Sequence, residues 1–254
     1  MSKQRIGIAM SGGGIKGVCH AGVLKALEEH NLKPDILSGV SAGSIVGAFY
    51  SDGYSPDQIG ELFSDVNFRQ WTKIGIPTKG FFSIDPFVEF LKKNLRTKRL
   101  ENLPIPLRIV ATDLDNGRSE TFTSGNLVDC IAASCSVPVL FHPRKINNTN
   151  YVDGGVFKNF PVSTIRNDCD YLIGINASPL VANDYKLSII NVAARSYHFM
   201  FKANIVHDKE LCDFLIEPPD MAHFDTFETE KSKEIFSLGY KTAKELLETK
   251  KDKN

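Results

Sequence analysis

The feature that most constrains this chain is a junction, used twice, in which a short apolar strand passes through a glycine-rich turn into a helix. The first junction joins a strand expected over 5–10 to a helix that opens near Gly17. The second joins a strand over 36–40 to a helix over 42–51. Apolar strands expected later in the chain, at 107–112, 171–176 and 214–217, also alternate with helices. Among these helices, one is expected after the capping box at 55–58, one from Pro161 and one after the capping-box spacing at 225–228. This alternation predicts an α/β fold with a mostly parallel central sheet flanked by helices.

The length and charge of the chain narrow its class. It has 254 residues, of which 42% are apolar and 24% charged, as in ordinary globular proteins. Chains of this length commonly form one domain, so residues 1–254 are expected to be a single domain. The formal net charge is zero, whereas nucleic-acid-binding domains usually carry an excess of basic residues. The net charge also gives no strong attraction to anionic membranes.

The cysteines and the N-terminal segment indicate a reduced, cytoplasmic protein. Five cysteines without a C-x-x-C pair favour free buried thiols over disulfides or a zinc site. The apolar run Ile6–Met10 is too short for a signal-peptide core. No stretch approaches the ~18 apolar residues that a membrane span needs.

The second junction carries the sharpest chemical signal, the G-x-S-x-G pattern from Gly39 to Gly43. Between a strand and a helix, this pattern is typical of a nucleophile elbow, with Ser41 as the nucleophile. The flanking glycines would let the strand and helix backbones pass closely, and the helix N-terminus would favour developing negative charge. The alternative is a plain tight turn in which Ser41 only caps the helix.

The first junction, Gly12–Gly17, allows three interpretations. Its G-x-G-x-x-G spacing fits a dinucleotide-binding turn, but that function needs an acid at the end of the next strand, where Ser41 stands instead. It could also be a tight strand–helix turn without further function. We favour a third interpretation, in which the unobstructed N–H groups of Gly12, Gly13 and Gly14 stabilise the oxyanion of an acyl-transfer intermediate.

A nucleophilic serine needs a base, and Asp153 is the favoured candidate. It follows a short strand and precedes Gly154 and Gly155, which would let its backbone approach another element closely. Taken alone, this Asp-Gly-Gly box is more often a turn. The histidines that follow Ser41 lie in no recognisable active-site loop: His142, His198, His207 and His223.

Together, these three motifs resemble the patatin-like phospholipase family, including bacterial members and the catalytic domain of the neuropathy target esterase group. The family's glycine-rich motif, G-x-S-x-G and Asp-Gly-Gly box occur here in the same order. Further similarity lies in 20–28, 112–114, 133–134 and 137–138, and the resemblance covers most of residues 5–175. The rest would be C-terminal helices and a strand (176–249) and a tail (250–254). Ser11 precedes the glycines, as in bacterial rather than plant members.

The resemblance implies a patatin-like fold and a serine carboxylic-ester hydrolase that releases fatty acids from phospholipids, lysophospholipids or other acyl lipids. Ser41 and Asp153 would form a catalytic dyad that works through an acyl-enzyme. No metal or cofactor is implied, and the sequence has no calcium loop. The partners would be an acyl-lipid substrate and, transiently, a membrane surface, with no nucleic acid.

Two other functions remain open at this point, namely a thioesterase or another serine acyl hydrolase, and a non-catalytic lipid-binding regulator on the same fold. The segment 68–83 contains aromatic residues and glycines that suit a mobile apolar entrance for an acyl chain. The alternative is that these aromatic side chains pack into the core.

Overall fold

The computed structural model describes residues 4–65, 83–138, 140–179, 204–226 and 228–251, together with Leu187, Phe199 and Phe201. The expected acyl-chain entrance at 68–83 lies outside the described residues, apart from Ser83.

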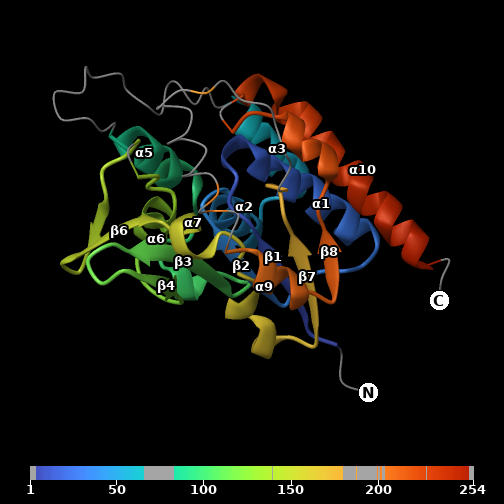
Figure 1. Ribbon diagram of the computed structural model, residues 1–254, viewed down its shortest axis with the longest axis horizontal. Helices are drawn as coiled ribbons and strands as arrows, with labels where there is room; N and C mark the ends of the chain where they lie inside the picture. Colours follow the sequence, from blue (N-terminus) through green and yellow to red (C-terminus); the bar gives the residue numbers. More distant parts are fainter. Residues whose placement is uncertain are drawn as a thin grey trace.

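An eight-stranded mixed sheet forms the middle of the fold (Figure 1). Its order is β5-β6-β3-β2-β1-β7-β8, with β4 paired to β3. The pairings among β3, β2, β1, β7 and β8 are parallel, whereas β4, β5 and β6 pair antiparallel. The strands are β1 (Ile6–Met10), β2 (Ile36–Val40), β3 (Leu107–Asp113), β4 (Arg118–Phe122), β5 (Arg144–Ile146), β6 (Thr149–Asp153), β7 (Tyr171–Ile175) and β8 (Phe214–Ile216).

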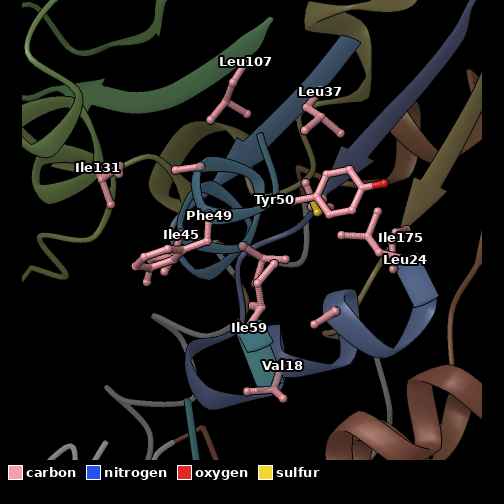
Figure 2. Packing of buried hydrophobic residues seen from close by; sticks show 14 of the residues in the cluster. Val18, Leu24, Leu37, Ile45, Phe49, Tyr50, Ile59, Leu107, Ile131 and Ile175 are labelled. Carbon is pink, nitrogen blue, oxygen red and sulfur yellow. The ribbon is translucent and has the colours of Figure 1, made fainter. Parts of the chain in front are cut away.

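Both faces of the central strands are covered, which explains why these strands are mostly apolar rather than alternating with polar residues. Successive side chains of a strand point to opposite faces. In β1, Ile8 and Met10 therefore join the large core cluster beneath the helices, whereas Ala9 joins a smaller cluster on the other face. Figure 2 shows part of the large cluster, in which Phe49 and Ile59 come from two different helices.

Helices surround this sheet, and the longest of them packs along the first. The C-terminal helix contacts the helices that start at Val18 and Pro56, and Figure 1 shows it running beside the first of these. No helix in the described part of the chain is long and apolar enough to cross a membrane. The helices are α1 (Val18–Glu29), α2 (Ala42–Ser51), α3 (Pro56–Asp65), α5 (Asp85–Asn94), α6 (Leu127–Ser134), α7 (Gly155–Lys158), α9 (Val206–Glu210) and α10 (Ser232–Lys251).

The predicted fold class is confirmed, but two expected helices differ. A helix expected from Pro161 is replaced by two 3-10 turns, Val162–Thr164 and Arg166–Asp168. The last helix, expected after a capping box at 225–228, begins only at Ser232, after another 3-10 turn. The five cysteines are free as predicted, although only Cys19, Cys130 and Cys135 are buried.

Candidate active site

Strand register brings Ser41 and Asp153 to the same level of the sheet. Val40, the last residue of β2, lies beside Val110 of β3. The next residue of β3, Ala111, lies beside Asp153 of β6, and β6 pairs with the same edge of β3 as β2, because β4 occupies the other edge. Ser41 follows Val40 directly, so Ser41 and Asp153 lie next to each other along this edge of β3.

The glycine after Asp153 lets the chain pass close to both β3 and β2. A Cβ placed on Gly154 would overlap the Val110 carbonyl oxygen and lie 2.8 Å from Val40 Cγ2. Only a residue without a side chain fits there. The next glycine, Gly155, donates its N–H to Asp153 Oδ1 over 2.8 Å. The Asp-Gly-Gly box thus brings the carboxyl group close to β2 and anchors it.

Ser41 has the backbone of a nucleophile elbow. Its φ is 50° and its ψ is −123°, a strained conformation for a residue that is not glycine. The close approach predicted for the flanking glycines is present. A Cβ on Gly39 would lie 2.6 Å from the Ser44 nitrogen, and one on Gly43 would lie 2.8 Å from the Ser11 carbonyl oxygen.

A buried serine of α6 holds this elbow in place. The Ser41 N–H donates to Ser134 Oγ over 2.7 Å, and the Ser134 hydroxyl donates in turn to the Val110 carbonyl over 2.6 Å. On the other side of the turn, the Ser44 hydroxyl donates to the Ser41 carbonyl over 2.7 Å. These bonds tie the strained residue to β3 and to α2.

The Asp153 carboxyl is buried and has a perturbed pKa. The residue is 1% exposed. Burial raises the pKa of Asp153 to about 6, and hydrogen bonds from the Ser41 side chain and the Gly155 N–H limit that rise. Asp153 is therefore mostly ionised at neutral pH, yet it is a stronger base than an aspartate in water. Such a group can accept a proton from a neighbouring hydroxyl.

The three glycines predicted as oxyanion donors are not equivalent. The N–H of Gly12 already donates to the Asn159 carbonyl over 3.1 Å, so it is not available to an oxyanion. Within the part of the chain that the structure describes, the N–H groups of Gly13 and Gly14 have no acceptor. Gly14 has a φ of 60°, which disfavours a side chain at this position. Two of the three predicted donors are thus open.

A buried histidine supports the start of this glycine loop. His20 of α1 is fully buried, and its Nε2–H donates to the Ser11 carbonyl over 2.8 Å. Burial lowers the pKa of His20 to about 4, against the hydrogen bond to Ser11, so the ring is neutral at physiological pH. This contact positions the loop at the end of β1.

No histidine forms a hydrogen bond with Ser41 or Asp153 among the described residues. His142, His207 and His223 are exposed, and His198 lies outside the described residues. The thiol of Cys135 lies at the site, with its Sγ 4.0 Å from Ser44 Oγ. Burial and the nearby Asp153 raise the pKa of Cys135, which keeps this thiol protonated.

The sequence motifs predicted no role for three residues at this site. Ser134 and Cys135 lie in or beside the segment 133–138 that carried part of the family resemblance, so a signal for them existed. Asn159 gave no signal, because nothing in the segment 156–161 marks a polar residue as part of a site.

The chain matches one protein family over most of these elements. A family model described as patatin-like phospholipase matches residues 8–165. The chain is 24% identical to "Lysophospholipase NTE1" of Kluyveromyces lactis over 100% of the chain and 20% of that protein. It is 28% identical to an uncharacterized NTE family protein of Mycobacterium bovis over 71% of the chain and 49% of that protein. The chain thus spans about half or less of the length of these relatives.

A solved structure shares the fold. The crystal structure of VipD from Legionella pneumophila aligns with a TM-score of 0.63 at 14% identity, covering 98% of this chain and 67% of VipD. At this identity the match concerns the fold alone.

Proposed function

The chain belongs to the patatin-like phospholipase family, and from this premise we propose that it is a serine hydrolase that cleaves fatty-acyl ester bonds of lipids through Ser41 and Asp153. The observation that carries the proposal is the placement of Ser41. It lies in a strained elbow at the same level of the sheet as a buried carboxyl whose pKa is raised to about 6.

In the proposed reaction, Ser41 Oγ attacks the ester carbonyl carbon while Asp153 accepts the hydroxyl proton. The carbonyl oxygen gains negative charge, which the N–H groups of Gly13 and Gly14 stabilise together with the N-terminus of α2. The tetrahedral intermediate collapses, and the alcohol leaves with the proton from Asp153. Water then attacks the acyl-enzyme with Asp153 again acting as base, which releases the fatty acid and restores Ser41.

Lysophospholipids are the first substrates to examine, because several relatives bear the name lysophospholipase. Phospholipids and other acyl esters remain within the proposal, as do transient contact with a membrane surface and a cytoplasmic location. A thioesterase would use the same serine and carboxyl. A lipid-binding regulator would bind these lipids without turnover.

Turnover on a substrate panel separates these functions. The panel consists of lysophosphatidylcholine, phosphatidylcholine, a p-nitrophenyl acyl ester, an acyl thioester and a peptide. We expect the wild type to cleave the oxygen esters fastest and Ser41→Ala to be inactive. The matched control is Ser38→Ala, because Ser38 is a buried serine of β2 whose hydroxyl contacts Thr164 Oγ1 (2.7 Å) and neither Ser41 nor Asp153.

Each alternative gives a different result. Thioesters cleaved much faster than all oxygen esters would favour a thioesterase. Lipid binding without turnover in the wild type would favour a regulator. Equal turnover by wild type and Ser41→Ala would exclude Ser41 as the nucleophile.

A further inference from the structure

We propose that Asn159 is a further catalytic residue, whose side-chain amide donates a hydrogen bond to the oxyanion that forms when Ser41 attacks an ester. This inference rests on the proposed function, because it assigns a role within the same reaction. It starts from the Asn159 side-chain amide, which forms no hydrogen bond with any residue that the structure describes and lies between the glycine loop and the Asp-Gly-Gly box.

The backbone of Asn159 is fixed from two sides. Its N–H donates to Asn204 Oδ1 over 2.8 Å, and its carbonyl accepts the Gly12 N–H over 3.1 Å. Asn159 therefore occupies the N–H of Gly12, which leaves those of Gly13 and Gly14 for an oxyanion. The residue is 3% exposed, so it is held inside the protein.

The side-chain amide lies beside Ser41. A Cβ placed on Gly12 would overlap Asn159 Oδ1 and lie 3.4 Å from the Ser41 Cβ. A Cβ placed on Gly155 would lie 2.8 Å from the same oxygen. The amide thus fills a space that both glycines leave open. The amide nitrogen is attached to the same carbon as Oδ1, and rotation about the last side-chain bond exchanges the two atoms.

This amide has no hydrogen-bond partner among the described residues, although the backbone N–H and the carbonyl of Asn159 each form a hydrogen bond. Asp153 accepts hydrogen bonds from the Ser41 side chain and the Gly155 N–H, and none from Asn159. The fully buried side-chain polar atoms that lack a partner in the described part of the chain do not include those of Asn159, so its amide reaches accessible space beside Ser41, where a ligand can supply the partner. Next to Ser41, the acceptor that the reaction creates is the oxyanion. The amide N–H of Asn159 would join those of Gly13 and Gly14 as a third donor.

The test compares Asn159→Ala and Asn159→Asp with the wild type on a p-nitrophenyl acyl ester at pH 8, where Asp153 is ionised. Asn159→Asp keeps the shape of the side chain and removes both N–H donors. We expect kcat to fall by about 10²–10³ in both variants, the loss typical of one oxyanion donor, with KM within threefold of the wild type. Thermal unfolding checks the fold. The matched control is Asn94→Ala, since the Asn94 amide donates only to the Phe90 carbonyl of its own helix (2.8 Å).

Three results would overturn the inference. A folded Asn159→Ala with kcat within threefold of the wild type shows that no donor was lost. A fall in kcat that Asn159→Asp restores shows that only the shape of the side chain matters. A rise in KM with kcat unchanged places the amide in substrate binding. If the wild type itself shows no turnover, the proposed function fails first, and the inference falls with it.

Discussion

At the scale of single residues, the buried carboxyl of Asp153 lowers the free energy of unfolding of the protein at neutral pH. Its folded pKa of about 6 lies above the ~3.9 of an unfolded aspartate, so between these values the folded state binds more protons. Stability therefore falls as the pH rises from about 4 to about 6 and stays reduced above that range. The shift corresponds to a penalty on the order of 3 kcal/mol at neutral pH.

Replacing Asp153 by asparagine should therefore separate stability from activity. Asp153→Asn removes the buried charge and keeps the shape, so we expect a higher melting temperature than the wild type at pH 8 and no such gain at pH 4. Turnover should fall by at least ~10²-fold, the lower end for loss of a general base. Thermal unfolding and ester hydrolysis at both pH values measure this. An active Asp153→Asn would exclude the carboxyl as base.

The same pKa predicts how activity depends on pH. The base must be ionised in the free enzyme, so kcat/KM for a neutral ester should rise with pH, with an apparent pKa of about 6, and level off above pH 7. A pH–rate profile of the wild type between pH 4.5 and 8.5 measures it. A profile that keeps rising through pH 8 would be inconsistent with Asp153 as the base.

At the scale of elements, α6 supports the elbow although it lies 93 positions from Ser41 in sequence. The hydroxyl of its last residue, Ser134, accepts a hydrogen bond from the Ser41 N–H and donates one to the Val110 carbonyl of β3. The strained turn therefore depends on a helix for which the sequence predicts no contact with Ser41. Loss of this contact leaves the Ser41 N–H without its acceptor.

Ser134→Ala should destabilise the protein by about 1–3 kcal/mol, as expected for a hydrogen-bonding group that loses its partner. It should also lower kcat about tenfold or more, because Ser41 loses its fixed orientation. The control is Ser136→Ala, since the Ser136 hydroxyl donates only to the Ala132 carbonyl of the preceding helix α6 (2.8 Å). Chemical denaturation and steady-state kinetics measure both effects. Equal behaviour of the two variants would remove Ser134 from the positioning role.

The helices and strands that the sequence predicts correctly are those whose start or end is determined by residues close to them in sequence. Gln58 and Ser55 form a reciprocal capping box, with distances of 2.9 and 3.2 Å, at the start of α3.

The helix expected from Pro161 does not form, because other groups make hydrogen bonds with the backbone of this segment. The Ser163 N–H donates to the buried Asp208 carboxyl over 2.6 Å, and the Thr164 hydroxyl donates back to the Pro161 carbonyl over 2.6 Å. Asp208 lies 45 positions away, so no local pattern could reveal this competition.

At the scale of the whole molecule, the site depends on strand register. Local motifs marked Ser41, Asp153 and the glycines, but their common level on the sheet follows from how β2, β3 and β6 pair. The same long-range packing assigns the Gly12 N–H to Asn159 and leaves Gly13 and Gly14 open. A sequence pattern cannot distinguish three adjacent glycines whose different roles are set by a residue of another loop.

The most direct test of this account is covalent labelling with a fluorophosphonate probe, mapped by mass spectrometry. We expect the probe to attach to Ser41 in the wild type and not in Ser41→Ala. Labelling should persist in His142→Gln, His207→Gln and His223→Gln and fall strongly in Asp153→Asn. Undiminished labelling of Ser41→Ala would contradict the account. So would a folded histidine variant that is not labelled while Asp153→Asn still reacts.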